Sequence, residues 1–343
     1  MTFNFDEKDS CGVGFIASRG VPRTHGMTLK ILECLSNLDH RGAKFADGTG
    51  DGAGVLTEIP FELIEAELAE RGIDKKEDSN LGLISCFFDP KNVAESMELI
   101  DNKLKEFDID LLYWRKVPTD KEILGALAKK SKPGIYQAII CSNKEYKYKF
   151  EKYLFLFRKS LETDLAKNEF LNIHINSCSS RTVVYKGLFT ATQTADFYWD
   201  LRNPLYKTRY GIFHQRFSTN TTSTWDKAQP LRMLAHNGEI NTIRANYSWM
   251  KAREVDASSN LWKEDIDTLK PFIDENLSDS GQLDNAIELL VQSGRKLAHA
   301  QEMLIPSAWE NNPRFTKDQQ SYYQYHAFLT EPWDGPAAIV ATD

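Results

Sequence analysis

The 343-residue chain is 41% hydrophobic and 27% charged, with a formal net charge of −7 at pH 7. This composition is typical of a soluble globular protein, and a negative charge without any basic run argues against a nucleic-acid partner. No stretch approaches the roughly 20 apolar residues that cross a bilayer, and the start MTFNFDEKDS lacks the apolar core of a secretory signal. Five scattered cysteines fit a reducing compartment, so we expect a cytoplasmic protein.

Strand and helix patterns alternate along the chain. In order, we expect a strand at 11–17, a helix at 25–38, a strand at 52–59, a helix at 60–68, a strand at 81–88, a helix at 93–104 and a strand at 111–117. After these come a helix through 154–161, strands at 172–177, 182–188, 210–217 and 232–236, and helices at 240–253 and 283–293. The polar segments 74–80 and 141–149 are expected to be loops. The pattern predicts one compact domain of mixed α and β structure.

The end of the chain resembles an unfinished hairpin. The segment DGPAAIVATD (334–343) ends on a strand followed by an Asp, a residue typical of a hairpin turn. We therefore expect the chain to be the front part of a longer protein, with its domain incomplete at the C-terminus.

The glycine-rich segment and the histidines give only weak indications of a metal or phosphate site. Residues 47–58 nearly match the calcium-loop template, but a strand pattern and Pro60 follow where an EF-hand needs a helix. The same glycines lack the Gly-Lys-Ser/Thr of a phosphate loop. The seven histidines show no Cys-x-x-Cys or His-x-x-x-His spacing, so no metal site is expected.

Cys11 differs from the other cysteines. It opens the first strand after a short polar leader, and Gly12 and Gly14 leave space around it. If the bond before Cys11 were cut, the free α-amine, with a reference pKa of about 8, could act as a general base for the thiol of the same residue. From the residues alone, reactive and inert roles both stay open. The remaining cysteines lie in apolar or strand-end contexts typical of inert buried thiols: Cys34, Cys86, Cys141 and Cys178.

Six motifs occur in a specific order. They are CGVGFIA (11–17), NLDHRGAKFADGTGDGAG (37–54), HQRFSTNT (214–221), LAHNGEINT (234–242), SDSGQLDNAIELL (278–290) and EPWDGPAAI (331–339). Together they resemble the amino-terminal glutaminase domain of the glutamate synthase large subunit, a class II glutamine amidotransferase, across residues 11–343. The amidophosphoribosyltransferase, glucosamine-6-phosphate synthase and asparagine synthetase families also share an amino-terminal Cys-Gly, a His-Arg-Gly and an Asn-Gly. The long insertion between Gly54 and Gly211, together with HQRFSTNT and EPWDGPA, resembles glutamate synthase alone.

The resemblance implies an α+β fold, the four-layer αββα sandwich of amino-terminal-nucleophile hydrolases. It also implies that residues 1–10 are a propeptide and that residues 11–343 form the glutaminase domain, with Cys11 as the nucleophile of the mature chain. The implied reaction is attack on the glutamine Cδ, a γ-glutamyl thioester at Cys11, release of ammonia, and hydrolysis to glutamate.

The remaining site residues are carried by the same resemblance. Asn237 and Gly238 match the oxyanion hole, Arg216 the group that binds the substrate α-carboxylate, Asp279 the acid that pairs with the α-ammonium, and Arg41 a position near the nucleophile. Read without the resemblance, these residues have ordinary structural roles. Asn-Gly is a turn signal, Asp279 or its neighbour Ser278 would cap a helix, and arginines commonly lie on surfaces or satisfy the last carbonyls of helices.

The implied partners are L-glutamine and the flavin-containing synthase domain of a full-length chain. Ammonia would pass through a tunnel to that domain, where 2-oxoglutarate is reductively aminated with FMN and an iron–sulfur cluster; no cofactor is expected in the present segment. A small subunit or ferredoxin is a further candidate partner, and the electron donor stays open between ferredoxin and a reduced nicotinamide. Two alternatives also stay open: another amide hydrolase with the same nucleophile, and an unprocessed, inactive binding or assembly module.

Overall fold

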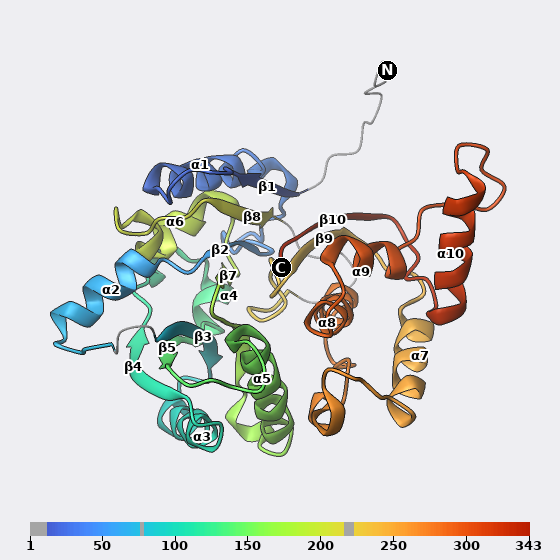
Figure 1. Ribbon diagram of the computed structural model, residues 1–343. Coiled ribbons are helices and arrows are strands. Elements are labelled where there is room, and N and C mark those ends of the chain that lie inside the picture. Colours follow the sequence, from blue (N-terminus) through green and yellow to red (C-terminus); the bar gives the residue numbers. More distant parts are fainter. Residues whose placement is uncertain (1–11, 76–78, 216–222) are drawn as a thin grey trace.

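The computed structural model describes residues 12–75, 79–215 and 223–343 and shows a mixture of helices and antiparallel sheets (Figure 1). Cys11 and Arg216 lie outside the described residues. The strands are β1 (Val13–Ala17), β2 (Ala53–Glu58), β3 (Asn80–Phe88), β4 (Asp110–Lys116), β5 (Gly134–Ser142), β6 (His174–Ser179), β7 (Thr182–Gly187), β8 (Tyr210–Gln215), β9 (Leu234–Gly238) and β10 (Ala337–Ala341). The helices are α1 (His25–Ser36), α2 (Phe61–Glu70), α3 (Val93–Glu106), α4 (Ala126–Lys130), α5 (Phe150–Ala166), α6 (Thr194–Phe197), α7 (Ile243–Val255), α8 (Asp279–Gln292), α9 (Leu297–Leu304) and α10 (Lys317–Leu329).

The strands form three sheets within the described residues: β1-β8-β2-β7, β4-β5-β3-β6 and the pair β10-β9. Neighbouring strands in all three are antiparallel. The pair β9–β10 packs against the β1-β8-β2-β7 sheet through one apolar cluster that includes Leu56, Ile212, Ala235 and the partly buried Val13. Sheet packing therefore joins two segments far apart in the sequence, the strand after Cys11 and the strand that carries Asn237.

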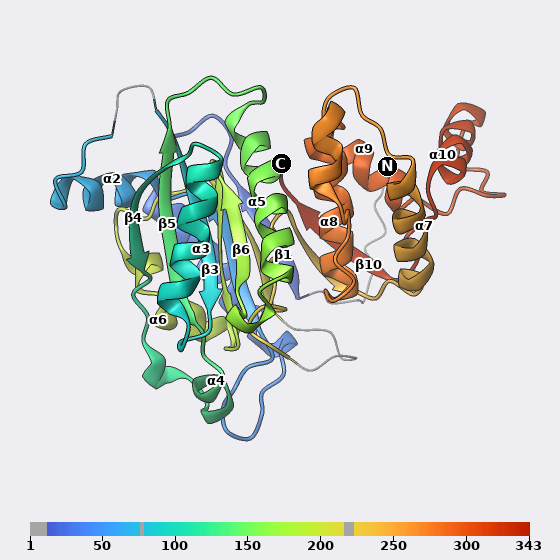
Figure 2. The ribbon, with the colours of Figure 1, turned by 90° about the horizontal axis from the view of Figure 1, so that it is seen from below.

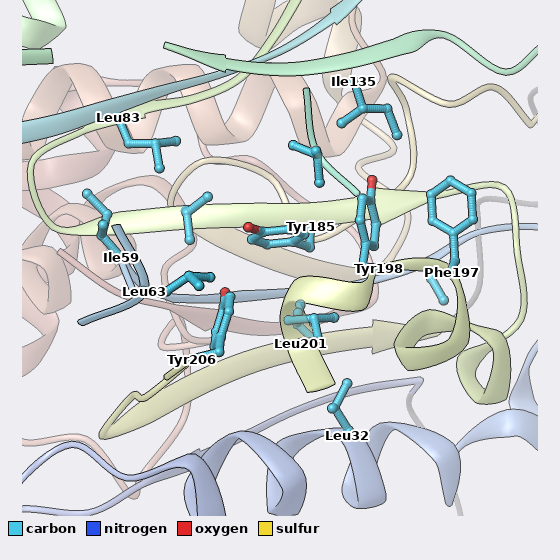
Figure 3. Packing of buried hydrophobic residues seen from close by; sticks show 14 of the residues in the cluster. Leu32, Ile59, Leu63, Leu83, Ile135, Tyr185, Phe197, Tyr198, Leu201 and Tyr206 are labelled. Carbon is cyan, nitrogen blue, oxygen red and sulfur yellow. The ribbon is translucent and has the colours of Figure 1, made fainter. Parts of the chain in front are cut away.

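The opposite face of the β1-β8-β2-β7 sheet is also buried. Val55 and Phe213, the chain neighbours of Leu56 and Ile212, join a second cluster with α1 and with the β4-β5-β3-β6 sheet. Successive side chains of a strand point to opposite faces, so burial of both faces explains why these strands are nearly continuous apolar runs. In Figure 3, Tyr185 of β7 lies between side chains of the second sheet and side chains on the α1 side.

The β4-β5-β3-β6 sheet is covered on its far side by α3 and α5 (Figure 2). Ile84, Phe88 and Ile140 from the sheet pack with Ile100 of α3 and Phe157 of α5. The chain then returns through β6 and β7, which are separated by the short turn at 180–181. This region lies between β2 and β7 in the chain and forms a layer of sheet and helices, and the other face of its sheet packs in the cluster with α1.

The C-terminal helices gather on one side of β9 and β10 (Figure 1). Leu283 and Ile287 of α8 share a cluster with Leu234 of β9, Trp262 and Trp333. The carboxylate of the buried Asp284 also joins α8 to the start of β9. Its Oδ1 accepts hydrogen bonds from the backbone N–H groups of Met233, at 2.9 Å, and Leu234, at 3.2 Å.

Most expected elements are present, with three corrections. The strand β5 was not expected, and the expected loop at 141–149 is wrong at its start, because Cys141 and Ser142 pair with β3 and β4. The helix expected from Leu283 begins at Asp279, since Ser278 caps it: the Ser278 Oγ accepts from the Gly281 N–H at 3.2 Å. The helices α4, α6, α9 and α10 were not expected. Across the described residues, no helix is both long enough and apolar enough to cross a membrane.

Candidate active site

The ends of β1 and β8 meet beside two of the expected site residues. Val13 pairs with His214, and the Gln215 N–H donates to the Gly12 carbonyl at 2.6 Å. Gly12 directly follows Cys11 in the chain, and Gln215 directly precedes Arg216. The described residues therefore begin at Gly12 and stop at Gln215 on either side of a single hydrogen bond between these two residues.

Arg41 belongs to a segment that lies against this pair. It is the last residue of a 3₁₀ turn at Asp39–Arg41, and its N–H donates to the Leu38 carbonyl at 2.8 Å. A Cβ added to the next residue, Gly42, would lie 1.7 Å from the Gln215 Nε2, so the backbone here passes directly against the Gln215 side chain. Arg41 is consequently beside the ends of β1 and β8, and its expected place near the nucleophile stays a prediction.

Asn237 and Gly238 are the last two residues of β9, opposite Ala338 and Ala337 of β10. The dipeptide therefore ends a paired strand and does not form a hairpin turn. Gly238 has φ of 148°, and a Cβ there would lie 1.8 Å from the Pro336 carbonyl oxygen. Backbone conformation and close approach both require glycine at this position.

Asp279 opens α8 and connects it to the chain after β9. Its Oδ2 accepts from the Ile240 N–H at 2.9 Å, and its Oδ1 accepts from the Ser280 N–H at 2.7 Å. Ser278, and not Asp279, is the helix cap. A carboxylate in the first turn is favoured by the helix dipole. The structure thus brings Asp279 and the Asn237 strand together, although 42 positions separate the two residues in the sequence numbering.

Sequence reasoning missed three polar residues around β9. His236 has 1% of its surface exposed, and its Nδ1 lies 2.8 Å from the Ser280 Oγ. The side chain of Gln229 clamps the His236 backbone: the Gln229 Oε1 accepts from the His236 N–H at 2.7 Å, and the Gln229 Nε2 donates to the His236 carbonyl at 2.9 Å. A histidine directly before Asn237 in an apolar strand could have signalled a buried imidazole that needs a polar partner.

The electrostatic surroundings of His236 favour a neutral ring. Burial lowers the pKa of His236, while the Asp279 carboxylate and the Pro336 carbonyl act in the opposite direction. Because burial prevails, the imidazole is uncharged near neutral pH, where an unperturbed histidine would already be mostly neutral.

The residues that resemble a calcium loop have structural roles. The Asp47 Oδ2 accepts from the Leu127 N–H at 2.7 Å, at the start of α4. Glu58 is buried in β2, where its Oε1 accepts from the Arg209 Nη2 at 2.6 Å. Within the described ranges, no cluster of three or more His, Cys, Asp or Glu side chains is arranged to hold a metal ion.

The described cysteines include three buried thiols, Cys86, Cys141 and Cys178, and the half-buried Cys34. Burial raises the pKa of the Cys86 and Cys178 thiols. Since the thiolate is the reactive form, these two side chains are poor nucleophiles.

Comparison with known proteins gives the family. The family model for class-II glutamine amidotransferases matches residues 11–343. The chain is 40% identical over 343 residues to the ferredoxin-dependent glutamate synthase of Pyropia yezoensis and 40% identical over 342 residues to the glutamate synthase (NADPH) large chain of Bacillus subtilis; each alignment covers 98% of this chain and 22% of the relative. It is also 37% identical over 351 residues to the glutamate synthase (NADH) of Saccharomyces cerevisiae, covering 98% of this chain and 16% of that protein.

The chain therefore spans about a fifth of the length of the first two relatives, 22% in each case. The family match, by contrast, extends from the cysteine before Gly12 to the last residue. Together with the glycine-dependent end of β9 and the carboxylate joined to it, this match shows that the chain belongs to the class-II glutamine amidotransferases.

Proposed function

We propose that this chain hydrolyses L-glutamine to glutamate and ammonia through a thioester at Cys11. The observation that carries the proposal is the junction of β1, β8 and β9. The Gly12–Gln215 hydrogen bond lies at 2.6 Å, and the apolar cluster of Val13 and Ala235 joins that end of β1 to the strand of Asn237. In the sequence, Cys11 directly precedes Gly12 and Arg216 directly follows Gln215.

In the proposed chemistry, each of these residues acts on a different step of the reaction with glutamine. Removal of residues 1–10 frees the α-amine of Cys11, which takes the thiol proton as the sulfur attacks the glutamine Cδ. The Asn237 side-chain amide and the Gly238 N–H stabilise the oxyanion, at about 3 kcal/mol for one such donor. Ammonia leaves with the proton returned by the amine, and water then hydrolyses the thioester.

Substrate recognition is assigned to three charged side chains. The planar guanidinium of Arg216 suits the α-carboxylate through paired charge-assisted bonds. The Asp279 carboxylate pairs with the α-ammonium, and Arg41 lies on the nucleophile side of the site. The support for Asp279 is its bond to Ile240, three residues after Asn237.

The proposed fold is the four-layer αββα sandwich of amino-terminal-nucleophile hydrolases, with residues 1–10 as the propeptide and 11–343 as the domain. Its two central layers would be the β1-β8-β2-β7 sheet and the β9–β10 pair, which share an apolar cluster. Support for the outer layers comes from α1, whose Ile31 packs against Gly211 of β8, and from α8, whose Asp284 bonds to the start of β9.

For the whole protein, the proposal is that the ammonia serves reductive amination of 2-oxoglutarate in a cytoplasmic glutamate synthase, an oxidoreductase. The support is the identity of 37 to 40% to proteins named glutamate synthase. FMN and an iron–sulfur cluster would belong to the synthase part. The names of these relatives include ferredoxin, NADPH and NADH, so the electron donor and a ferredoxin or small-subunit partner are not distinguished.

Intact mass and glutaminase assays test the proposal. The active protein should lack residues 1–10, and Cys11→Ala should abolish ammonia release from glutamine without loss of folding. Cys34→Ala is the matched control, because Cys34 lies half-buried in α1, and it should retain activity. An active protein that still carries Met1, or equal turnover of amides unrelated to glutamine, would contradict the proposal and favour another amide hydrolase; an unprocessed chain without activity would favour the binding or assembly module.

A further inference from the structure

A series of buried polar contacts connects the strand of Asn237 to the carboxylate of Asp279. The His236 Nδ1 lies 2.8 Å from the Ser280 Oγ, and that oxygen lies 3.3 Å from the Asp279 Oδ1. Both His236 and Ser280 are almost completely buried, with 1% and 4% of their surface exposed. Buried polar groups of this kind are costly unless they are bonded, so the contacts require an explanation beyond simple packing.

The Asp279 carboxylate is fixed from both sides. Its Oδ2 accepts from the Ile240 N–H at 2.9 Å, and its Oδ1 accepts from the Ser280 N–H at 2.7 Å with the Ser280 hydroxyl nearby. A carboxylate held by several donors keeps one orientation before any ligand arrives. Preorganisation of this kind lowers the entropy lost on binding.

His236 can fix the position of this carboxylate because the backbone of His236 is itself held on both sides of its strand. Gln229 bonds to both the N–H and the carbonyl of His236, and Ile339 of β10 lies opposite it in the sheet. The next residue in the strand is Asn237. A side chain that hydrogen-bonds to the His236 ring, as Ser280 does, is therefore held at a nearly fixed position relative to Asn237.

We propose that His236 and Ser280 are positioning residues that hold the Asp279 carboxylate in register with Asn237, and that this linkage makes the site selective for amides that carry an α-ammonium group. The inference rests on the proposed role of Asp279. According to this inference, the contact between β9 and α8 sets the distance between the carboxylate that binds the α-ammonium and the site where the amide reacts.

The hydroxyl of Ser280 has a single proton, so the direction of the linkage depends on which nitrogen of His236 is protonated. To donate to the Asp279 Oδ1, the hydroxyl must accept from a protonated His236 Nδ1. The Pro336 carbonyl also acts on this ring, and a proton on Nε2 would instead let Nδ1 accept from the Ser280 hydroxyl. In both arrangements Ser280 bonds to His236, while its backbone N–H donates to the Asp279 Oδ1 at 2.7 Å.

Two substrates separate positioning from general stability. Glutamine carries the α-ammonium, whereas glutaramic acid is the same molecule without its α-amino group and has no partner for Asp279. In Ser280→Ala and in His236→Leu, we expect the kcat/KM for glutamine to fall about tenfold, mainly through KM, as for loss of one hydrogen bond to a charged group. The kcat/KM for glutaramic acid should be nearly unchanged.

Matched variants complete the test. His236→Asn retains a nitrogen near the position of Nδ1 and should restore most of the preference for glutamine. Ser278→Ala removes a hydroxyl from the same helix start, where Ser278 caps the Gly281 N–H; it should lower the melting temperature and keep the ratio of the two kcat/KM values. Should His236→Leu fail to fold, Ser280→Ala decides the outcome.

The outcomes distinguish the inference from the function beneath it. If the unchanged protein releases no ammonia from glutamine, the proposed function fails. If Asp279→Asn leaves the preference for glutamine intact, the assignment of Asp279 fails. If Asp279→Asn removes the preference but a folded Ser280→Ala retains it in full, the linkage through His236 and Ser280 is wrong.

Discussion

Two regions of the molecule are buried to a similar extent by different means. Behind the β4-β5-β3-β6 sheet, side chains such as Ile140 and Phe157 contact other apolar groups from α3 and α5. Where β9, β10 and α8 meet, polar side chains such as His236, Ser280 and Asp284 are buried instead, and each makes hydrogen bonds to another segment. The first region depends on total volume, and the second on the position of individual atoms.

This difference follows from the direction dependence of the forces involved. Apolar burial stabilises in proportion to area and has no preferred direction, so side chains of similar volume can replace one another. A buried donor or acceptor must meet a partner at a defined distance and angle, and it costs free energy when it does not. Substitutions in the two regions should therefore affect different measurements.

The largest expected effect is on stability, in the apolar region. Phe157 is completely buried, and its ring contacts Phe107 edge-on, with centroids 5.5 Å apart. Phe157→Ala should lower the free energy of unfolding by about 4 kcal/mol, because it leaves a cavity and removes apolar contacts. Denaturant unfolding measures the loss. The KM for glutamine of the protein that remains folded should not change, and a change of several-fold would show that the two regions are coupled.

The next effect is on activity, in the polar region. Gly238→Ala places a Cβ 1.8 Å from the Pro336 carbonyl oxygen at φ of 148°, so the end of β9 must move away from β10. Displacement of an oxyanion donor should lower the kcat for glutamine about a hundredfold.

Gly294→Ala is the control for backbone strain alone. Gly294 has φ of 100°, with open space where a Cβ would lie, and its substitution should cost about 1 kcal/mol of stability with unchanged kinetics. Equal kinetic effects of the two substitutions would show that the approach of β9 to β10 is not what matters.

The same contrast explains what the sequence could predict. The strand at 81–88 was recognised as a continuous apolar run, and it is β3. Its neighbour β5 was missed because polar residues interrupt the pattern; Gln137 is buried there and accepts from the Arg115 Nη1 at 2.7 Å. From the sequence pattern alone, a polar side chain inside a sheet is predicted to be solvent-exposed, because its partner on another strand is not known.

For the site, the motifs predicted Asn237, Gly238 and Asp279 as site residues, and the structure brings Asp279 to the chain after β9. The partner of His236 could not be predicted, because its contact with Ser280 joins positions 44 residues apart. Hydrophobic periodicity reports which face of an element is buried, and it contains no information on which polar atoms meet across that face.

A third prediction concerns the boundary between the two regions, where charged residues connect α5 to α8. The buried Arg158 bonds to Glu162 on its own helix and to Glu288 of α8 at 2.5 Å. Burial by itself raises the pKa of Glu162, but Arg158, Arg232 and Lys159 outweigh it and lower the pKa from 4.5 to about 2. Folding therefore favours the ionised form of Glu162.

The sign of the pH dependence follows directly. The contribution of Glu162 to stability is present above pH 4.5, its unperturbed value, and is lost as the pH falls toward 2. Glu162→Gln should lower the free energy of unfolding by about 2 kcal/mol at neutral pH, a value reduced for partial exposure of the carboxylate, and the difference from the unchanged protein should shrink between pH 4.5 and 2. Denaturant unfolding at several pH values measures this. The exposed Glu98 on α3 supplies the control, Glu98→Gln, and a pH-independent difference for Glu162→Gln would contradict the assignment.

The smallest effect tests whether volume alone governs the apolar region. Ile140 of β5 lies opposite Gly82 of β3, and a Cβ on Gly82 would lie 3.2 Å from the Ile140 Cγ1 and the Leu154 Cδ1 and 3.3 Å from the Ile140 Cδ1. Ile140→Val should cost about 1 kcal/mol of stability, and Gly82→Ala alone should be destabilising because the added methyl is crowded. Ile140→Val removes only the Cδ1 of these three atoms, so the double variant relieves part of the crowding, and the two single costs should sum to more than the measured total by about 0.5 kcal/mol. If the two costs in stability add strictly, the added methyl does not use the space that Cδ1 leaves. Volume alone would then not govern the apolar region, and the contrast between the two regions would be wrong.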